Sequence, residues 1–214
     1  MKSPAYLIIG CGHFGRRAVQ TLAQGDPSAT IFVIDQHKET FRKISDLDVE
    51  TIHGDAVHRL GQILSSNQHV DYIIPAVPFH LAFEFLLLKL KPLGARRCEV
   101  PPLGRLPNAM RGKTGDVYTS FADFHCPEDC NEPARCTVTG RKRERPLYKV
   151  LADLSGAFDL RVIRSRQLAP GMGGFRTSDL LRLLKDLERR EASDRPFLIS
   201  TACCCHGVIS ALSS

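Results

Sequence analysis

The chain of 214 residues has no tryptophan and carries no signature of a known nucleic-acid-binding module, although its formal net charge is +6. Such a charge favours anionic partners without selecting one. Basic residues cluster at 141–145 and recur at Arg161, Arg164 and Arg166, and a solvated surface accounts for a run of this kind. Nucleic-acid binding therefore stays a minor hypothesis.

The sequence also has no stretch that reaches the roughly 18–20 uncharged apolar residues of a membrane-spanning helix. The longest apolar stretch, residues 79–90, is interrupted by His80, Glu84 and Lys89. Residues 5–9 run into glycines too early for a signal peptide. Hydrophobic residues make up 43% of the chain, which is enough for a sizeable core. The sequence predicts a soluble, cytoplasmic protein without membrane insertion, and a homodimer is left open.

Short apolar runs alternate with helical patterns in residues 1–100. The expected strands are 5–9, 30–35, 49–53, 70–75 and 95–100, and the expected helices are about 13–24, 37–46, 56–66 and 79–91. Continuous apolar strands between helices are typical of a parallel sheet covered on both faces. This pattern predicts an α/β fold with a doubly wound, mostly parallel, Rossmann-like sheet.

The pattern changes after Pro101. Residues 101–147 are rich in proline, glycine and cysteine, with one expected hairpin or strand at 115–124. Residues 148–214 return to alternation, with helices at 148–155 and 178–192 and strands at 160–165 and 197–201; Ser178 is the expected cap of the second helix. We expect this last part to extend the sheet of the first and the middle part to be an irregular insert.

Three glycines follow the first apolar run. Gly10, Gly12 and Gly15 form the G-x-G-x-x-G pattern between an expected strand and an expected helix. The first permits a tight turn, the second lets a pyrophosphate approach the backbone, and the third allows close helix–strand packing. His13 and Phe14 are expected to line the same site, together with Pro75 at the end of the fourth strand.

Asp35 ends the next expected strand, where an acidic side chain accepts hydrogen bonds from a ribose. A carboxylate at this place repels a 2′-phosphate. The combination predicts an NAD(H) site with a preference over NADP(H).

The stretches "IIGCGHFGRR", "VID" and "HGDA" resemble the TrkA-N or RCK-type NAD-binding domains of potassium-uptake regulators, over about residues 5–95. The resemblance implies that the loop glycines hold the diphosphate, that Asp35 binds ribose, and that Asp55 lies beside the adenine. Residues 75–80 look more like the corresponding loop of saccharopine-dehydrogenase-type enzymes. The rest of the chain resembles no transporter-regulator domain.

Eight cysteines in a cytosolic chain are more often metal ligands or reactive thiols than disulfides. Cys126, Cys130 and Cys136 lie within eleven residues of one another, beside His125. Their thiolates suit zinc or an iron–sulfur cluster, and both usually take four protein ligands at a structural site. We expect a metal to organise this insert.

A second group, at residues 203–206, follows the last expected strand. It consists of Cys203, Cys204, Cys205 and His206, of which Cys203, Cys205 and His206 are candidates for the missing ligand. Three adjacent side chains cannot all point at one ion, so one or two at most would ligate. Alternatively, these cysteines are small buried residues that lead into a last helix.

Arg164 lies near the end of the strand expected at 160–165, and Arg166 follows that strand; both precede a glycine-rich loop at 171–174. If the C-terminal strands extend the first sheet, these residues lie at its carboxyl edge and face a small anionic ligand near the nicotinamide. The alternative is an ordinary connection with surface arginines.

No Ser-His-Asp order, paired-carboxylate motif or Lys/Tyr pair is present, so no catalytic residue is predicted. The favoured function is an NAD(H)-binding, redox- or ligand-sensing regulatory protein with a thiolate metal site. The alternative is an NAD-dependent oxidoreductase that acts on a small anionic substrate. A third hypothesis, an interaction module that has lost its cofactor, conflicts with the intact glycines and Asp35.

Overall fold

The computed structural model describes residues 3–66, 68–191 and 193–213. In chain order the first elements are β1 (Ala5–Ile9), α1 (His13–Gly25), β2 (Thr30–Asp35), the 3₁₀ helix η1 (Lys38–Ile44), β3 (Glu50–His53), α2 (Ala56–Ser65), β4 (Tyr72–Pro75), α3 (Leu81–Leu90) and the 3₁₀ helix η2 (Lys91–Leu93). They are followed by β5 (Arg96–Cys98), β6 (Met110–Arg111), β7 (Val117–Ser120), α4 (Leu147–Ala152), β8 (Asp159–Arg164), β9 (Arg166–Ala169), β10 (Met172–Arg176), α5 (Thr177–Glu188), β11 (Phe197–Ala202) and β12 (His206–Ser213). The predicted α/β class is confirmed.

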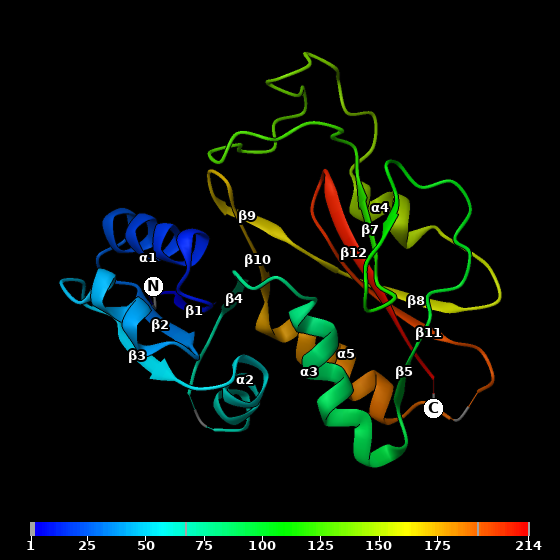
Figure 1. Cartoon of the computed structure of the whole chain (residues 1–214), viewed down its shortest axis with the longest axis horizontal. Helices are drawn as coiled ribbons and strands as arrows, with labels where there is room; N and C mark the ends of the chain where they lie inside the picture. The colour runs from blue at the N-terminus through cyan, green and yellow to red at the C-terminus, as the bar shows by residue number, and fades with distance from the viewer. Residues whose placement is uncertain (1–2, 67, 192, 214) are drawn as a thin grey trace.

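The first sheet has the order β3-β2-β1-β4-β10-β9, and its first four strands are parallel (Figure 1). β1 and β2 are apolar because both faces of the sheet are covered. Ile8 and Val33 pack against Val19 of α1, whereas Leu7 belongs to the core formed with α2, α3 and α5, for example with Phe83. The order reverses between β1 and β4, which is where dinucleotides bind in doubly wound sheets. This part is compatible with a Rossmann-like domain.

The expectation that the C-terminal strands extend this sheet is largely wrong. Only β10 and β9 join it, and both pairings that attach them are antiparallel. β8 and β11 belong to a second sheet with the order β6-β7-β12-β11-β8, and β5 pairs with β12 of that sheet rather than with the first four strands. The chain changes sheet at Ser165, between β8 and β9.

The last helix proposed as an alternative after the cysteines is also wrong. Residues 203–205 form a turn, and β12 returns antiparallel to β11 with Ala202 opposite Gly207. Buried apolar side chains of β12, such as Ile209 and Leu212, fit a strand that is covered on its faces. Both ends of the helix predicted at 178–192 differ as well: α5 ends at Glu188, and no side chain caps its N-terminus, so Ser178 is not its cap. Residue 192, the predicted end of that helix, lies outside the described residues.

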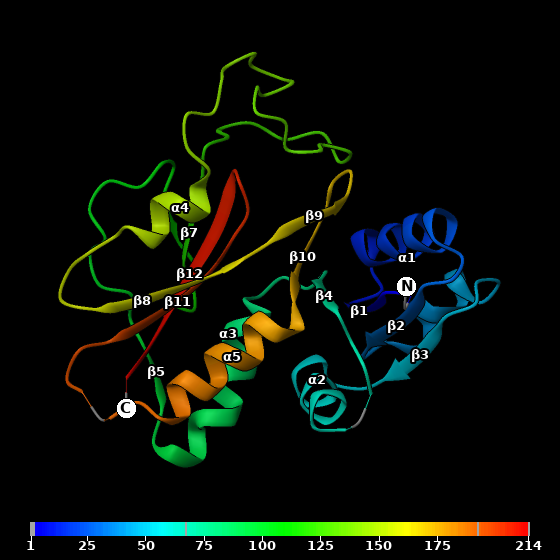
Figure 2. The ribbon, with the colours of Figure 1, turned by 180° about the vertical axis from the view of Figure 1, so that it is seen from behind.

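Helices α3 and α5 lie side by side where the two sheets meet (Figures 1 and 2). One core cluster contains residues of both sheets, including Ile73 of β4 and Ile199 of β11, together with Leu86 and Leu183 of these helices. The two sheets therefore share a core. Between β7 and α4, residues 121–146 extend away from both sheets and contain no helix or strand, apart from an isolated bridge between Arg135 and Lys142.

A buried histidine connects the chain after β4 to the second sheet. His80 precedes α3; its Nδ1 lies 2.8 Å from Ser210 Oγ and its Nε2 lies 2.9 Å from Thr201 Oγ1. The Ser210 hydroxyl donates to Asp116, so Nδ1–H of His80 donates to Ser210 and Nε2 accepts from Thr201. Burial lowers the pKa of His80 to about 3, and the ring is therefore neutral near pH 7.

Asp116 ties this network to charged groups. Its carboxylate accepts from Arg97 at 2.8 Å, and Arg97 also pairs with Glu84 of α3. The cost of burial is outweighed by hydrogen bonds from Ser210, Thr114 and Arg97, which together lower the pKa of Asp116. Every polar partner here is satisfied, as a buried network requires.

Across the part of the chain that the structure describes, no helix has both the length and the apolar character needed to cross a membrane.

Candidate functional site

The turn after β1 needs two of its glycines for packing. Gly10 has a φ of +96°, in the left-handed region that favours glycine, and an added Cβ would lie 2.5 Å from the carbonyl oxygen of Ala76. A Cβ on Gly15 would lie 1.8 Å from the carbonyl oxygen of Gly10. These two glycines let β1, α1 and the chain after β4 approach one another closely.

Gly12 is different, because packing within the protein does not explain it. It precedes α1 with a φ of −69°, and an added Cβ would meet no atom within 4 Å. No side chain caps the N-terminus of α1, and its first turn contains no acidic residue. Open space at an uncapped helix N-terminus fits an anionic group such as a diphosphate.

Asp35, at the end of β2, stabilises the glycine turn after β1 through hydrogen bonds. Its Oδ2 accepts a hydrogen bond from the Cys11 amide at 2.6 Å, and its Oδ1 accepts one from the His37 amide at 2.8 Å. A carboxylate oxygen accepts more than one hydrogen bond, so these contacts leave acceptor capacity for ribose hydroxyls. The side chain is half-buried and lies beside the glycine turn.

Asp55 has a structural role in addition to the one that the resemblance implies. Its Oδ1 accepts hydrogen bonds from the backbone amides of Val57 and His58, so Asp55 caps the N-terminus of α2. The same oxygen accepts a hydrogen bond from His58 Nδ1. Hydrogen bonds from His58 lower the pKa of Asp55 against the opposing effect of burial.

A cavity of about 420 Å³ lies between α1, the chain after β4 and the β9–β10 turn. Phe14, Pro75 and Arg17 are among its lining residues, and Phe14 is 61% exposed. His13 does not line it; its Nε2 lies 3.1 Å from Glu128 Oε1 of the cysteine-containing segment. The cavity opens at the carboxyl end of β4, beside the glycine turn.

A larger cavity of about 1180 Å³ brings the two cysteine groups together. All six predicted metal ligands line it: Cys126, Cys130, Cys136, Cys203, Cys205 and His206. His125 lines it too. Phe14, Gly171 and Gly173 line this cavity, called the cysteine cavity below, and the smaller one, so the two cavities adjoin.

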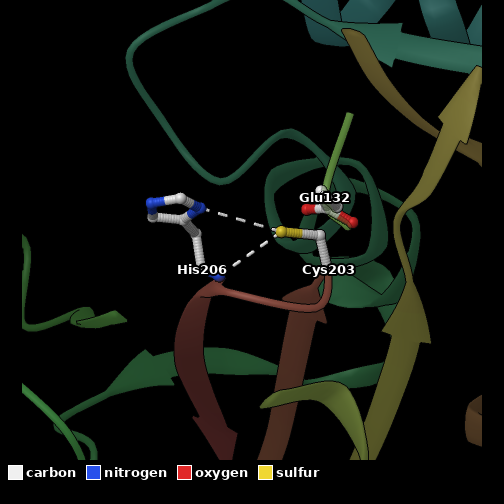
Figure 3. A group of neighbouring side chains, drawn as sticks. All are labelled: Glu132, Cys203 and His206. Atoms are coloured by element: carbon white, nitrogen blue, oxygen red, sulfur yellow. Dashed lines mark hydrogen bonds between the residues drawn. The ribbon is translucent and has the colours of Figure 1, made fainter. Parts of the chain in front are cut away.

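Within this cavity, one set of ligand atoms is already close together. Those of Glu132, Cys203 and His206 lie within 4.8 Å of one another, and Figure 3 shows the Cys203 sulfur between the other two side chains. Sequence reasoning found Cys203 and His206 but missed Glu132. No local signal marks Glu132, because it is far from the other two in the sequence.

The other cysteines have different surroundings. Cys126 Sγ lies 3.7 Å from His206 Nε2, and Cys205 Sγ accepts a hydrogen bond from Arg143 at 2.9 Å. The Cys130 carbonyl accepts from the Gly171 amide at 2.8 Å, which attaches the cysteine segment to the β9–β10 turn. Hydrogen bonds from the Thr139 side chain and from nearby backbone amides lower the pKa of Cys136. All eight cysteines are free thiols.

The two arginines predicted to bind a substrate have other partners. The Arg164 guanidinium stacks 4.5 Å from the centre of the Tyr148 ring, and Arg166 lies 3.6 Å from Asp179. Neither lines the two cavities described above. By contrast, Gly171 and Gly173 of the predicted 171–174 loop line both cavities.

Comparison with known proteins agrees with this architecture. Residues 6–78 match the family model described as "TrkA-N domain", which confirms the resemblance in the sequence and implies a nucleotide-binding domain of the NAD type. This class of nucleotide-binding domain accounts for the first four strands and the glycine turn.

The C-terminal part of the chain identifies the family to which the chain belongs. Residues 82–214 match the family model described as "Uncharacterized protein, C-terminal domain". An "Uncharacterized protein" of Archaeoglobus fulgidus is 32% identical over 220 residues, which cover 96% of this chain and 98% of the relative. The chain belongs to this family, and along it the TrkA-N match (residues 6–78) precedes the match to the C-terminal domain (residues 82–214).

Proposed function

We propose that the protein binds NAD(H) at the 10–15 turn and acts as a redox- or ligand-sensing regulatory protein with a metal bound in the cysteine cavity. The observation that carries the proposal is the open space at Gly12, at the uncapped N-terminus of α1. A diphosphate bound there gains from the helix dipole and the backbone amides. Asp35 then receives the adenosine ribose, and its charge disfavours a 2′-phosphate.

We expect Asp35→Asn to reduce the preference for NADH over NADPH by about ten- to a hundredfold, or roughly 1.4–2.8 kcal/mol. The reason is the loss of the charge that repels the 2′-phosphate. Calorimetric titration with both nucleotides measures the ratio. The exposed Asp48 is the matched control, since Asp48→Asn should leave the ratio unchanged. An equal preference in wild-type protein and Asp35→Asn would refute the ribose assignment.

The sensing role is supported by contacts between the two sites. Glu128 reaches across from the cysteine segment to α1, with its carboxylate 3.1 Å from His13 and 3.8 Å from Arg17. Arg17 also donates to the Glu128 carbonyl and, at 3.4 Å, to that of Pro170. A diphosphate at the start of α1 would compete with the Glu128 carboxylate for this positive end of the helix.

Saturation with NADH should therefore speed amide hydrogen exchange in residues 121–146, by up to about fivefold for the loss of an exposed ion pair. In Glu128→Ala the effect of NADH should be smaller, because that contact is already absent. Asp129→Ala, at the exposed neighbouring carboxylate, is the control and should respond like wild-type protein. Exchange that is identical with and without bound NADH would count against a sensing role.

A second candidate function is an NAD-dependent oxidoreductase that acts on a small anionic substrate. The observation in its favour is that the cysteine cavity and the smaller cavity beside α1 share Phe14, Gly171 and Gly173. The stacking of Arg164 and the ion pair of Arg166 give no support to a substrate role for these arginines, whereas Arg17 already lines the smaller cavity. NADH oxidation that depends on an added small anionic carbonyl compound would favour this function over sensing.

A further inference from the structure

In the turn between β11 and β12, backbone hydrogen bonds fix the position of the Cys203 sulfur. The Cys203 amide donates to the His206 carbonyl at 2.9 Å, which closes the turn. Cys203 Sγ accepts from the amides of Cys205 at 3.4 Å and His206 at 3.3 Å. Burial and the nearby Glu132 carboxylate raise the pKa of the Cys203 thiol against the lowering effect of these two amides, and a metal ion bound to a thiol deprotonates it.

The same turn places an imidazole nitrogen beside that sulfur. Cys203 Sγ and His206 Nδ1 are 3.8 Å apart. Zn–S bonds of about 2.3 Å and Zn–N bonds of about 2.0 Å put two such ligands of a tetrahedral ion about 3.5 Å apart. The Cys203-x-x-His206 turn therefore already has nearly the spacing of two zinc ligands.

Glu132 supplies a third ligand from the segment between β7 and α4. Its carboxylate accepts from the Cys204 amide at 3.4 Å and lies within 4.8 Å of the two other ligand atoms (Figure 3). Glu132 has a φ of +52°, a conformation that is uncommon for residues other than glycine. The backbone thus adopts a costly conformation at the residue that brings a carboxylate to the cysteine and the histidine.

On the other side of the ring, Cys126 Sγ lies 3.7 Å from His206 Nε2. Histidines that ligate a metal through one nitrogen usually donate the N–H of the other to a partner, which fixes the tautomer. Cys126 is placed to accept that hydrogen bond, so it is a positioning residue for His206 rather than a ligand of the same ion.

We propose that Cys203 Sγ, His206 Nδ1 and a Glu132 carboxylate oxygen bind one zinc ion, with a fourth coordination position open to the cysteine cavity. Three protein ligands with one open position are typical of zinc sites that bind water or a small ligand, whereas structural sites are closed by four. One thiolate among three ligands also excludes an iron–sulfur cluster at this place, because such clusters are held by several cysteines. The inference rests on the proposed function only in placing the metal in this cavity.

The test uses full-length protein stripped of metal under reducing conditions and titrated with Zn²⁺ against a chromophoric chelator. Wild-type protein should bind one equivalent. Cys203→Ser, His206→Asn and Glu132→Gln should each weaken binding by more than about 100-fold, because even partners outside the ligand set cost 10–100-fold. The matched controls are Cys130→Ser and Cys136→Ser, which line the same cavity and should bind zinc within about threefold of wild-type protein.

The absorption spectrum of the cobalt-loaded protein provides a second readout, which is measured on wild-type protein and does not require that a variant folds. Wild-type protein loaded with Co²⁺ should show the charge-transfer absorption of one thiolate, and azide should shift its d–d bands through the open position.

Cys126→Ser should keep one equivalent of metal with an affinity about 10–100-fold lower. A spectrum of three or four thiolates, no response to azide, or loss of metal in Cys130→Ser but not in Cys203→Ser would each overturn the assignment. The titration contains no nucleotide, so failure of NAD(H) binding is read separately.

Discussion

Gly12→Ala should abolish most of the NAD(H) binding while leaving the fold intact. The added methyl group meets no protein atom within 4 Å, and the φ of −69° is allowed for alanine, so the melting temperature should stay within about 2 °C of wild-type protein. The same methyl group occupies the space where a diphosphate would approach the backbone. We expect the affinity for NADH to fall at least about 100-fold, equivalent to roughly 2.8 kcal/mol, by calorimetry.

Gly15→Ala is the contrasting variant. Its Cβ would lie 1.8 Å from the Gly10 carbonyl oxygen, so the backbone must move. Overpacking of this kind should destabilise the protein by about 3 kcal/mol or more, which is a fall in melting temperature of roughly 6–12 °C. If Gly12→Ala binds NADH as wild-type protein does, the space at Gly12 is not the diphosphate site.

Stability should fall steeply as the pH is lowered from 6.5 toward 3, with His80 as a main contributor. Its pKa is about 3 in the folded protein and 6.5 in the unfolded chain. Between these values the unfolded chain binds a proton that the folded protein does not, so acid favours unfolding by up to about 1.4 kcal/mol per pH unit. The contribution is fully present above pH 6.5 and is lost by pH 3.

Urea unfolding of wild-type protein and His80→Gln measures this contribution. Each protein is compared with its own free energy of unfolding at pH 7. Between pH 7 and pH 4, wild-type protein should lose about 3 kcal/mol more than the variant. Nuclear magnetic resonance provides a check that does not need the variant, because the His80 ring should stay neutral at pH 4. A ring that becomes protonated near pH 6 in the folded protein would contradict the buried network with Ser210 and Thr201.

The N-terminal half was predicted well because its signals are local. The bounds of β1 and β2 are those expected, since both strands are apolar on both faces and are closed by glycine or aspartate. The glycine spacing also predicted α1, which begins one residue after Gly12. Asp55 was less well described, because its helix-capping role depends on the turn in front of α2 and not on the motif alone.

The second sheet could not be predicted as a whole because the pairings of β12 with β5 and β7, and of β11 with β8, join distant segments. β12 lies between β7 and β11, and neither its antiparallel direction nor its partner β5 leaves a pattern in the sequence. The turn before β12 contains cysteines in place of the usual Gly or Asn, which concealed the hairpin. The alternation of helices and strands after residue 148 suggested that β8 continues the first sheet. Instead β8 pairs with β11, and the chain changes sheet at Ser165.

The cysteine cavity shows the same limit. Grouping predicted that Cys126, Cys130 and Cys136 belong together, and they do line one cavity with Cys203 and His206. The closest ligand atoms nevertheless include those of Glu132, which spacing alone does not distinguish from the other exposed or half-buried carboxylates of the segment. Which ligands converge depends on the turn between β11 and β12, and therefore on the sheet that the sequence did not predict.

Titration of wild-type protein with NADH and NADPH, followed by nicotinamide fluorescence, measures whether the protein binds NAD(H) and which of the two nucleotides it prefers. We predict saturable binding of one NADH per chain, with NADPH binding at least about tenfold weaker, a difference of roughly 1.4 kcal/mol. Absence of saturable NADH binding by folded protein, or NADPH binding as tight as NADH binding, would contradict this prediction.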